Sequence, residues 1–194
     1  MSITFPLTPP STPGNKRISF KPRTIVGIQA SKFTGQQQVV AWPGQWWEAE
    51  IVLPAMTDIQ AEAWLGFTLA LNGPEGTFWL ADSVLKAPQG TLSGSWTVNG
   101  TQTAGSTTLA VTGGSGTWTV GDWLQVGNFL HKVMKVNAGS VDVFPRLPSA
   151  YANGTAIVIT AAKGLFRLME PVGWSVGDAK IYDGLTIKAT SVLT

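Results

Sequence analysis

Residues 31–80 constrain the fold more than any other part of the chain, because strand-like segments in them flank the one segment with a clear helical pattern. Apolar and polar side chains alternate through residues 46–53. One face of this segment carries Trp47, Ala49, Ile51 and Leu53. A strand that is buried on one face gives this alternation.

A helix is predicted directly after this strand. Thr57 and Gln60 have the spacing of a capping box, in which each side chain satisfies a free backbone N–H of the first turn. The Asn72-Gly73-Pro74 sequence predicts where the helix ends, because glycine adopts the left-handed conformation easily and proline cannot continue the hydrogen-bond ladder. The side chains expected on the buried stripe are Ile59, Ala63, Trp64, Phe67 and Leu71.

The segments around this core read as further strands and turns. Residues 17–28 predict a strand that is broken at Pro22, and residues 32–41 predict a second strand with a bulge at Thr34-Gly35. Pro43-Gly44 is a turn signal. Residues 77–81 predict the strand that follows the helix.

The second half of the chain is rich in Thr, Gly and Val, and its short strands are separated by glycine turns. This spacing is typical of a small barrel or sandwich. In the tail, Asp183-Gly184 predicts a hairpin between AKIY and LTIKATSVL. The strands expected before the tail lie near 94–98, 107–111, 122–127, 129–136, 140–144 and 155–160.

These patterns predict a mainly β fold with one α-helix (α+β). Residues 1–16 form an extended N-terminal arm. Residues 17–90 together with 164–194 form a β-sandwich-like belt domain, provided that the tail pairs with the first sheet. Residues 91–163 are then a small all-β domain inserted into it.

Charge is scarce and unevenly placed. Charged residues make up 12% of the chain, about half the usual share, which suggests that other chains cover part of the surface. The basic residues Lys16, Arg17, Lys21, Arg23 and Lys32 all precede the first acidic residue, Glu48. They are either solvated strand charges or contacts to an acidic partner or to passing DNA. Without interleaved aromatic residues they do not predict a sequence-reading domain.

The search for chemistry is negative, and we expect no enzyme, no metal and no cofactor. The chain has no cysteine and one histidine, His131, which cannot supply a zinc site. Glu48 and Glu50 share a strand face at a spacing that a glycosidase pair could use, but two solvent-facing acids explain them better. The first residues lack the pattern of a signal peptide, and no segment is long enough to span a membrane, so neither secretion nor membrane insertion is expected.

The nine tryptophans leave two functions open. Tryptophans on core faces favour a structural role, whereas exposed, coplanar rings would stack on sugars and favour a carbohydrate- or receptor-binding module. The candidates for ligand stacking are Trp96, Trp118 and Trp123.

The segment FTGQQQVVAWPGQWWEAEIVLPAMT, the later LNGPEGTFWL with its following Asp82, and the segments GDWLQVG and VFPRLPSAYANGTAI together resemble the distal tail proteins of long-tailed bacteriophages and of phage-like gene transfer agents. The resemblance spans roughly residues 17–190. It rests on glycines, prolines and aromatic residues, without a catalytic signature.

The resemblance implies a structural virion protein, made in the host cytoplasm, at the tail tip. Distal tail proteins form hexameric rings around the DNA channel, built from belt domains. One face stacks on the tail tube protein and the other on the baseplate hub protein. The outer domain can carry receptor-binding or side-fibre proteins, and DNA only passes through the channel. Lys16, Arg17, Lys21 and Arg23 would then be interface candidates, facing the channel or an acidic neighbouring ring.

Overall fold

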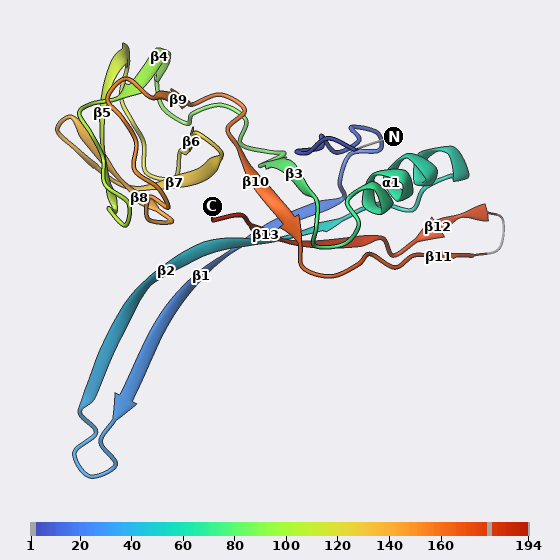
Figure 1. Cartoon of the computed structure of the whole chain (residues 1–194), viewed down its shortest axis with the longest axis horizontal. Coiled ribbons are helices and arrows are strands. Elements are labelled where there is room, and N and C mark those ends of the chain that lie inside the picture. The colour runs from blue at the N-terminus through green and yellow to red at the C-terminus, as the bar shows by residue number, and fades with distance from the viewer. Residues whose placement is uncertain (1–2, 178–179, 194) are drawn as a thin grey trace.

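The computed structural model describes residues 3–177 and 180–193, and it confirms the predicted fold class. The one α-helix in these residues, α1 (Asp58–Ala70), accompanies a five-stranded sheet, a two-stranded ribbon and a closed six-stranded barrel. Figure 1 shows three parts: the barrel, the sheet with α1, and a long hairpin that leaves the sheet and projects away from both.

The five-stranded sheet joins strands from both ends of the chain. Its order is β1-β2-β13-β10-β3, with all neighbours antiparallel. The C-terminal tail therefore pairs with the first region of the chain, and the barrel strands lie between β3 and β10 in sequence. The bounds are β1 Arg17–Ala30, β2 Gln37–Val52, β3 Thr77–Ala81, β10 Lys163–Leu168 and β13 Thr186–Ser191.

The alternation in β2 sets the inner face of this sheet. Trp47, Ala49, Ile51 and Leu53 are all buried, as the sequence predicts. They share one core with residues of α1 and with Trp123 and Leu130 of the barrel, which lie against Trp47. Removing the Ile51 side chain from water contributes about 1.5–3 kcal/mol. The opposite face carries the charged residues of β1, β2 and β13.

Helix α1 ends where the sequence predicts, but its buried stripe is shifted. Asn72 and Gly73 both adopt positive φ, at 50° and 63°, which ends the helix. Ile59 faces solvent with 83% of its surface exposed, and Ala63 is exposed too, so both were wrongly placed in the core. The predicted capping box is also wrong, because the Thr57 side chain makes no capping hydrogen bond. The buried residues of the helix are Ala61, Trp64, Leu65, Phe67 and Thr68.

Strands β1 and β2 form one long hairpin. The bulge predicted at Thr34-Gly35 lies in the turn of this hairpin, and the turn predicted at Pro43-Gly44 is a bulge within β2. Residues 31–36, including Thr34-Gly35, form the turn, where Ser31 N–H donates to the Gln36 carbonyl at 2.8 Å and Gly35 has φ of 68°. Pro43-Gly44 lies inside β2 as a bulge, since the register moves from Thr24↔Gln45 to Val26↔Ala41. A Cβ on Gly44 would lie 2.7 Å from Ile25 Cδ1, so a larger residue there would have to displace the exposed Ile25 side chain. Pro22 does not break β1, because β1 is an edge strand and tolerates a missing donor.

The barrel contains the six strands that the sequence predicts for the second half. Its closed order is β4-β5-β8-β7-β6-β9, which leaves no free edge. Its core is built mostly from Val, Leu and Trp side chains. The strands are β4 Ser93–Val98, β5 Thr108–Ser115, β6 Trp123–Val126, β7 Phe129–Asn137, β8 Ser140–Phe144 and β9 Ala156–Val158.

The C-terminal tail does not form the predicted hairpin around Asp183-Gly184. Strand β12 (Tyr182–Asp183) pairs with β11 (Ser175–Val176), and Gly184, with φ of 73°, leads into β13. Strand β13 instead fills the gap between β2 and β10. A local turn signal could not reveal this, because the partners of β13 lie far away in sequence.

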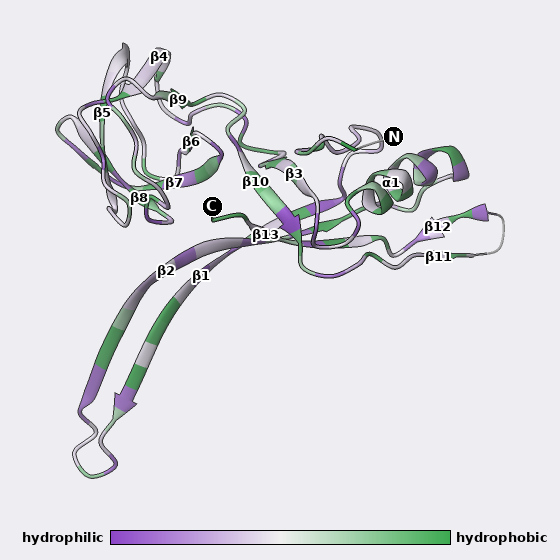
Figure 2. Ribbon diagram, in the orientation of Figure 1, coloured by the Kyte–Doolittle hydropathy of each residue, from purple (hydrophilic) through white to green (hydrophobic). Residues whose placement is uncertain are grey.

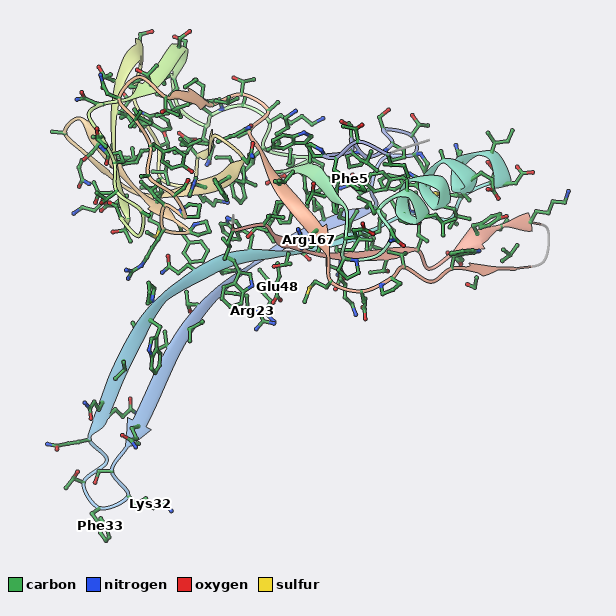
Figure 3. All side chains as sticks on the ribbon, in the orientation of Figure 1. Phe5, Arg23, Lys32, Phe33, Glu48 and Arg167 are labelled. Carbon is green, nitrogen blue, oxygen red and sulfur yellow. The ribbon has the colours of Figure 1, made fainter. Side chains whose placement is uncertain are left out.

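Among the described residues of the N-terminal segment, Phe5 and Leu7 lie against the sheet instead of extending into solvent. Leu7 N–H donates to the Thr77 carbonyl at 2.9 Å, and Trp79 N–H donates to the Leu7 carbonyl at 3.0 Å, so Leu7 covers part of the outer edge of β3. The Phe5 and Leu7 side chains pack against the core. Figure 3 shows Phe5 beside the sheet and α1. In the part of the chain that the structure describes, no helix is long and apolar enough to cross a membrane.

Candidate assembly surface

The outer part of the β1–β2 hairpin, residues 24–45, stands apart from the body of the protein except at its base, where Gln45 Oε1 accepts a hydrogen bond from the Arg146 N–H at 3.0 Å (Figure 1). We call it the projecting hairpin. Pairing of β13 with β2 stops at Thr190↔Glu48, before the projecting hairpin begins. Within residues 3–177 and 180–193, no third strand pairs with residues 24–30 or 37–45, so both edges expose free backbone N–H and C=O groups.

One face of the projecting hairpin is almost entirely apolar. Ile28 lies directly opposite Val39, and Val26 lies directly opposite Ala41. Residues directly opposite each other share a face in an antiparallel pair. Ile28 and Val39 are 65% and 59% exposed. In Figure 2 bands of the hydrophobic colour recur along the outer part of both strands, far from the core.

The other face is mixed but carries the largest exposed side chain of the hairpin. Trp42 is 51% exposed and lies over Gly27, where a Cβ would come within 2.9 Å of the indole ring. Val40 lies beside it, and Gln29 and Gln38 continue this face toward the tip. The hairpin therefore offers apolar surface on both sides.

Charge is nearly absent from the projecting hairpin. Lys32 is the only charged residue among residues 24–45. Its neighbour Phe33 is 100% exposed at the tip (Figure 3). A free two-stranded hairpin is marginally stable in water, and open apolar edge strands promote association. The physical expectation is that another surface covers this hairpin.

Of the four basic residues that the sequence proposes as interface candidates, Lys21 and Arg23 lie near the base of the projecting hairpin, whereas Lys16 and Arg17 lie at the other end of β1, opposite Val52. Two of the four are neutralised within the chain. Arg17 pairs with Glu50 at 2.7 Å, and Arg23 pairs with Glu48 at 2.8 Å. Figure 3 shows Arg23 and Glu48 on the same side of the sheet. Lys16 and Lys21 form no ion pair with any residue that the structure describes. The basic segment is thus an edge strand beside two acids, and the positive charge left for a partner is small.

The same ion pairs occupy the two carboxylates considered for glycosidase chemistry. Glu48 and Glu50 are each held by an arginine on the outer face of the sheet. Among the described residues, no group of three or more His, Cys, Asp and Glu side chains could hold a metal ion.

His131 is a structural residue of the barrel. Its Nδ1 lies 2.9 Å from the Pro145 carbonyl oxygen, which fixes the ring. Burial lowers the pKa of His131 to about 4, because the charged form would lose its hydration. The imidazole is therefore neutral at physiological pH, and no carboxylate among the described residues bonds to it.

The three tryptophans proposed for ligand stacking are all buried, which corrects that proposal. Trp96 and Trp118 contact each other inside the barrel, with ring centroids 5.2 Å apart. Trp123 packs against Trp47 at 5.3 Å, and its indole N–H donates to Asp82 at 3.0 Å. Trp96 and Trp118 point into the barrel and Trp123 points into the core of the five-stranded sheet, so none of the three presents an open face to a sugar.

The residues that the sequence failed to single out are those of the projecting hairpin. The available signal was a long segment with one charge and apolar side chains on both strand faces. Such a segment suits a surface that is buried by a partner. No protein-family model and no curated protein matches the chain.

Proposed function

We propose that this chain is a structural protein of a phage tail tip, whose copies assemble into a ring that joins the tail tube to the baseplate hub. The observation that carries the proposal is the projecting hairpin, with both edges open, apolar side chains on both faces and a single charge. The resemblance to distal tail proteins supports the same role and implies six copies per ring. Receptor-binding or side-fibre proteins would attach to the barrel.

The size of the hairpin suits a stable contact between subunits. Strands rise about 3.3 Å per residue, so residues 24–30 extend about 23 Å; two strands are about 10 Å wide. The two faces of this segment together have an area of about 500 Å², taken as flat rectangles without the protruding side chains. This is of the order of the roughly 800 Å² per partner of a standard interface. A head-to-tail contact of this kind closes into a ring when its rotation permits.

The tail tube protein, the hub protein and passing DNA are partners of the ring under this proposal. The two basic side chains of this segment that form no ion pair with a described residue, Lys16 and Lys21, would contribute to such contacts without reading a DNA sequence. A carbohydrate-binding role is less favoured because Trp96, Trp118 and Trp123 are buried.

The proposal is tested by the mass of the purified protein in solution. A ring of six 20.6 kDa chains has a mass of about 124 kDa. The double variant Ile28→Thr, Val39→Thr keeps β-branched side chains but removes apolar surface, and it should reduce assembly. The matched control is Gln29→Thr, Gln38→Thr, a directly opposite pair on the other face that is polar already. A protein that stays monomeric at all concentrations would contradict the proposal.

A further inference from the structure

A second exposed apolar surface lies at the C-terminal end of α1. A groove of about 270 Å³ is lined there by Thr68, Leu69, Asn72, Gly73, Pro74, Pro171 and Val172. We call it the helix-end groove. Leu69 is 64% exposed on its wall. Pockets for drug-sized ligands begin at about 300 Å³, so this groove suits a single side chain better than a ligand.

The electrostatics of the helix-end groove favour a positive partner. The last turn of α1 contains no basic residue, so the negative end of the helix dipole is not compensated by a side chain of its own. Glu75 follows the groove residues directly, and its carboxylate accepts a hydrogen bond from Asn72. Within the described residues Glu75 has no ion-pair partner.

The tip of the projecting hairpin has the complementary features. It presents one fully exposed aromatic side chain, Phe33, next to the only charge of the hairpin, Lys32. The tip lies far from α1 in Figure 1, with the sheet between them, so a chain cannot place its own tip in its own groove. A second copy of the chain can.

We infer that the hairpin tip of one copy docks in the helix-end groove of the next copy, with Phe33 in the groove and Lys32 beside Glu75. This inference rests on the proposed ring and specifies which surfaces join. The contact is heterologous, because the tip and the groove are different patches of the chain. A chain of such contacts closes into a ring or continues as a filament.

The chain has no cysteine, so every disulfide formed in a crosslinking experiment must join cysteines introduced by substitution. A tagged Thr34→Cys protein, which keeps Phe33 and carries the cysteine on the next exposed residue of the tip, and an untagged Leu69→Cys protein, mixed and oxidised, should form a tagged–untagged dimer. A single chain that carries both substitutions should give a ladder of covalent multimers. The matched control replaces Leu69→Cys by Ile59→Cys, which is also exposed on α1 but lies about 15 Å away along the helix.

A charge exchange gives an independent readout. Lys32→Glu should weaken self-association by about 2–5-fold, the effect of one exposed ion pair. The double variant Lys32→Glu, Glu75→Lys restores the opposite charges and should recover most of this loss. Failure of the double variant to recover the loss would contradict the Lys32–Glu75 contact.

The outcomes separate the docking from the ring itself. Oligomers of the expected mass in which Thr34→Cys crosslinks to Ile59→Cys as well as to Leu69→Cys would overturn the docking and leave the ring standing. A protein without any oligomers would overturn both. Sedimentation of the wild-type protein, but not Phe33→Ser, with phosphatidylcholine vesicles in place of self-association would instead identify a membrane as the partner of the tip.

Discussion

Trp47 of β2 donates its indole N–H to the carbonyl of Leu130 on β7, at 3.1 Å. This bond crosses from the five-stranded sheet to the barrel. The same indole ring contacts Trp123 and Phe144 of the barrel, with centroids 5.3 and 4.9 Å away. An aromatic cluster and a buried hydrogen bond therefore join the inserted barrel to the sheet, so the projecting hairpin starts from a rigid base.

Trp47→Phe should lower the free energy of unfolding by about 2–4 kcal/mol, because it leaves the Leu130 carbonyl unsatisfied and opens space in the cluster. Urea unfolding followed by circular dichroism measures this. Trp174→Phe is the control, since Trp174 is partly exposed and its substitution should change stability by less than about 0.5 kcal/mol. Equal effects of the two substitutions would contradict the role given to Trp47.

Gly76→Ala should destabilise the protein by about 1–3 kcal/mol. A Cβ at Gly76 would lie 2.5 Å from a Phe5 ring carbon and 2.8 Å from the Leu71 carbonyl oxygen, so the N-terminal segment must move. Gly66→Ala is the matched test inside α1, where nothing lies within 4 Å of the new Cβ. It should stabilise by about 0.5–1 kcal/mol, because alanine favours the helix. Thermal unfolding of the two variants should thus shift in opposite directions.

Stability should fall as the pH drops below about 6.5, because His131 is the only histidine and its pKa is lowered to about 4 by burial. Between these two values the unfolded chain binds a proton that the folded chain does not, so unfolding is favoured as the pH falls. The loss amounts to about 2 kcal/mol between pH 7 and pH 5 and levels off below pH 4. Urea unfolding at pH 7, 6 and 5 measures it. In His131→Gln, whose amide can still donate to Pro145, this part of the pH dependence should disappear.

The sequence predicts those elements whose pattern is set by neighbouring residues, such as a strand with one buried face or a turn marked by glycine. Trp47, Ala49 and Ile51 alternate because one face of β2 is buried, and the barrel strands are separated by glycine turns. It fails where distant pairing decides the outcome. Pro43-Gly44 marks a bulge and not a turn because the strand β1 continues opposite it.

Distant strand pairing also explains why the candidate surface could not be predicted from the sequence. Burial of Trp96 and Trp118 follows from closure of the barrel, which no local pattern reveals. The exposed position of Ile28 and Val39 follows from the absence of a third strand beside them in the described part of the chain. Sequence patterns identify both residues as strand residues and cannot say that the sheet ends before it reaches them.

The most direct test of the central claim is the solution mass of the wild-type protein measured beside that of Ile28→Thr, Val39→Thr by light scattering after size exclusion. We predict a closed oligomer for the wild type, near 124 kDa for six 20.6 kDa chains, and a much smaller species for the variant. A wild-type protein that elutes as a 20.6 kDa monomer at every concentration, unchanged by the two substitutions, would contradict the account.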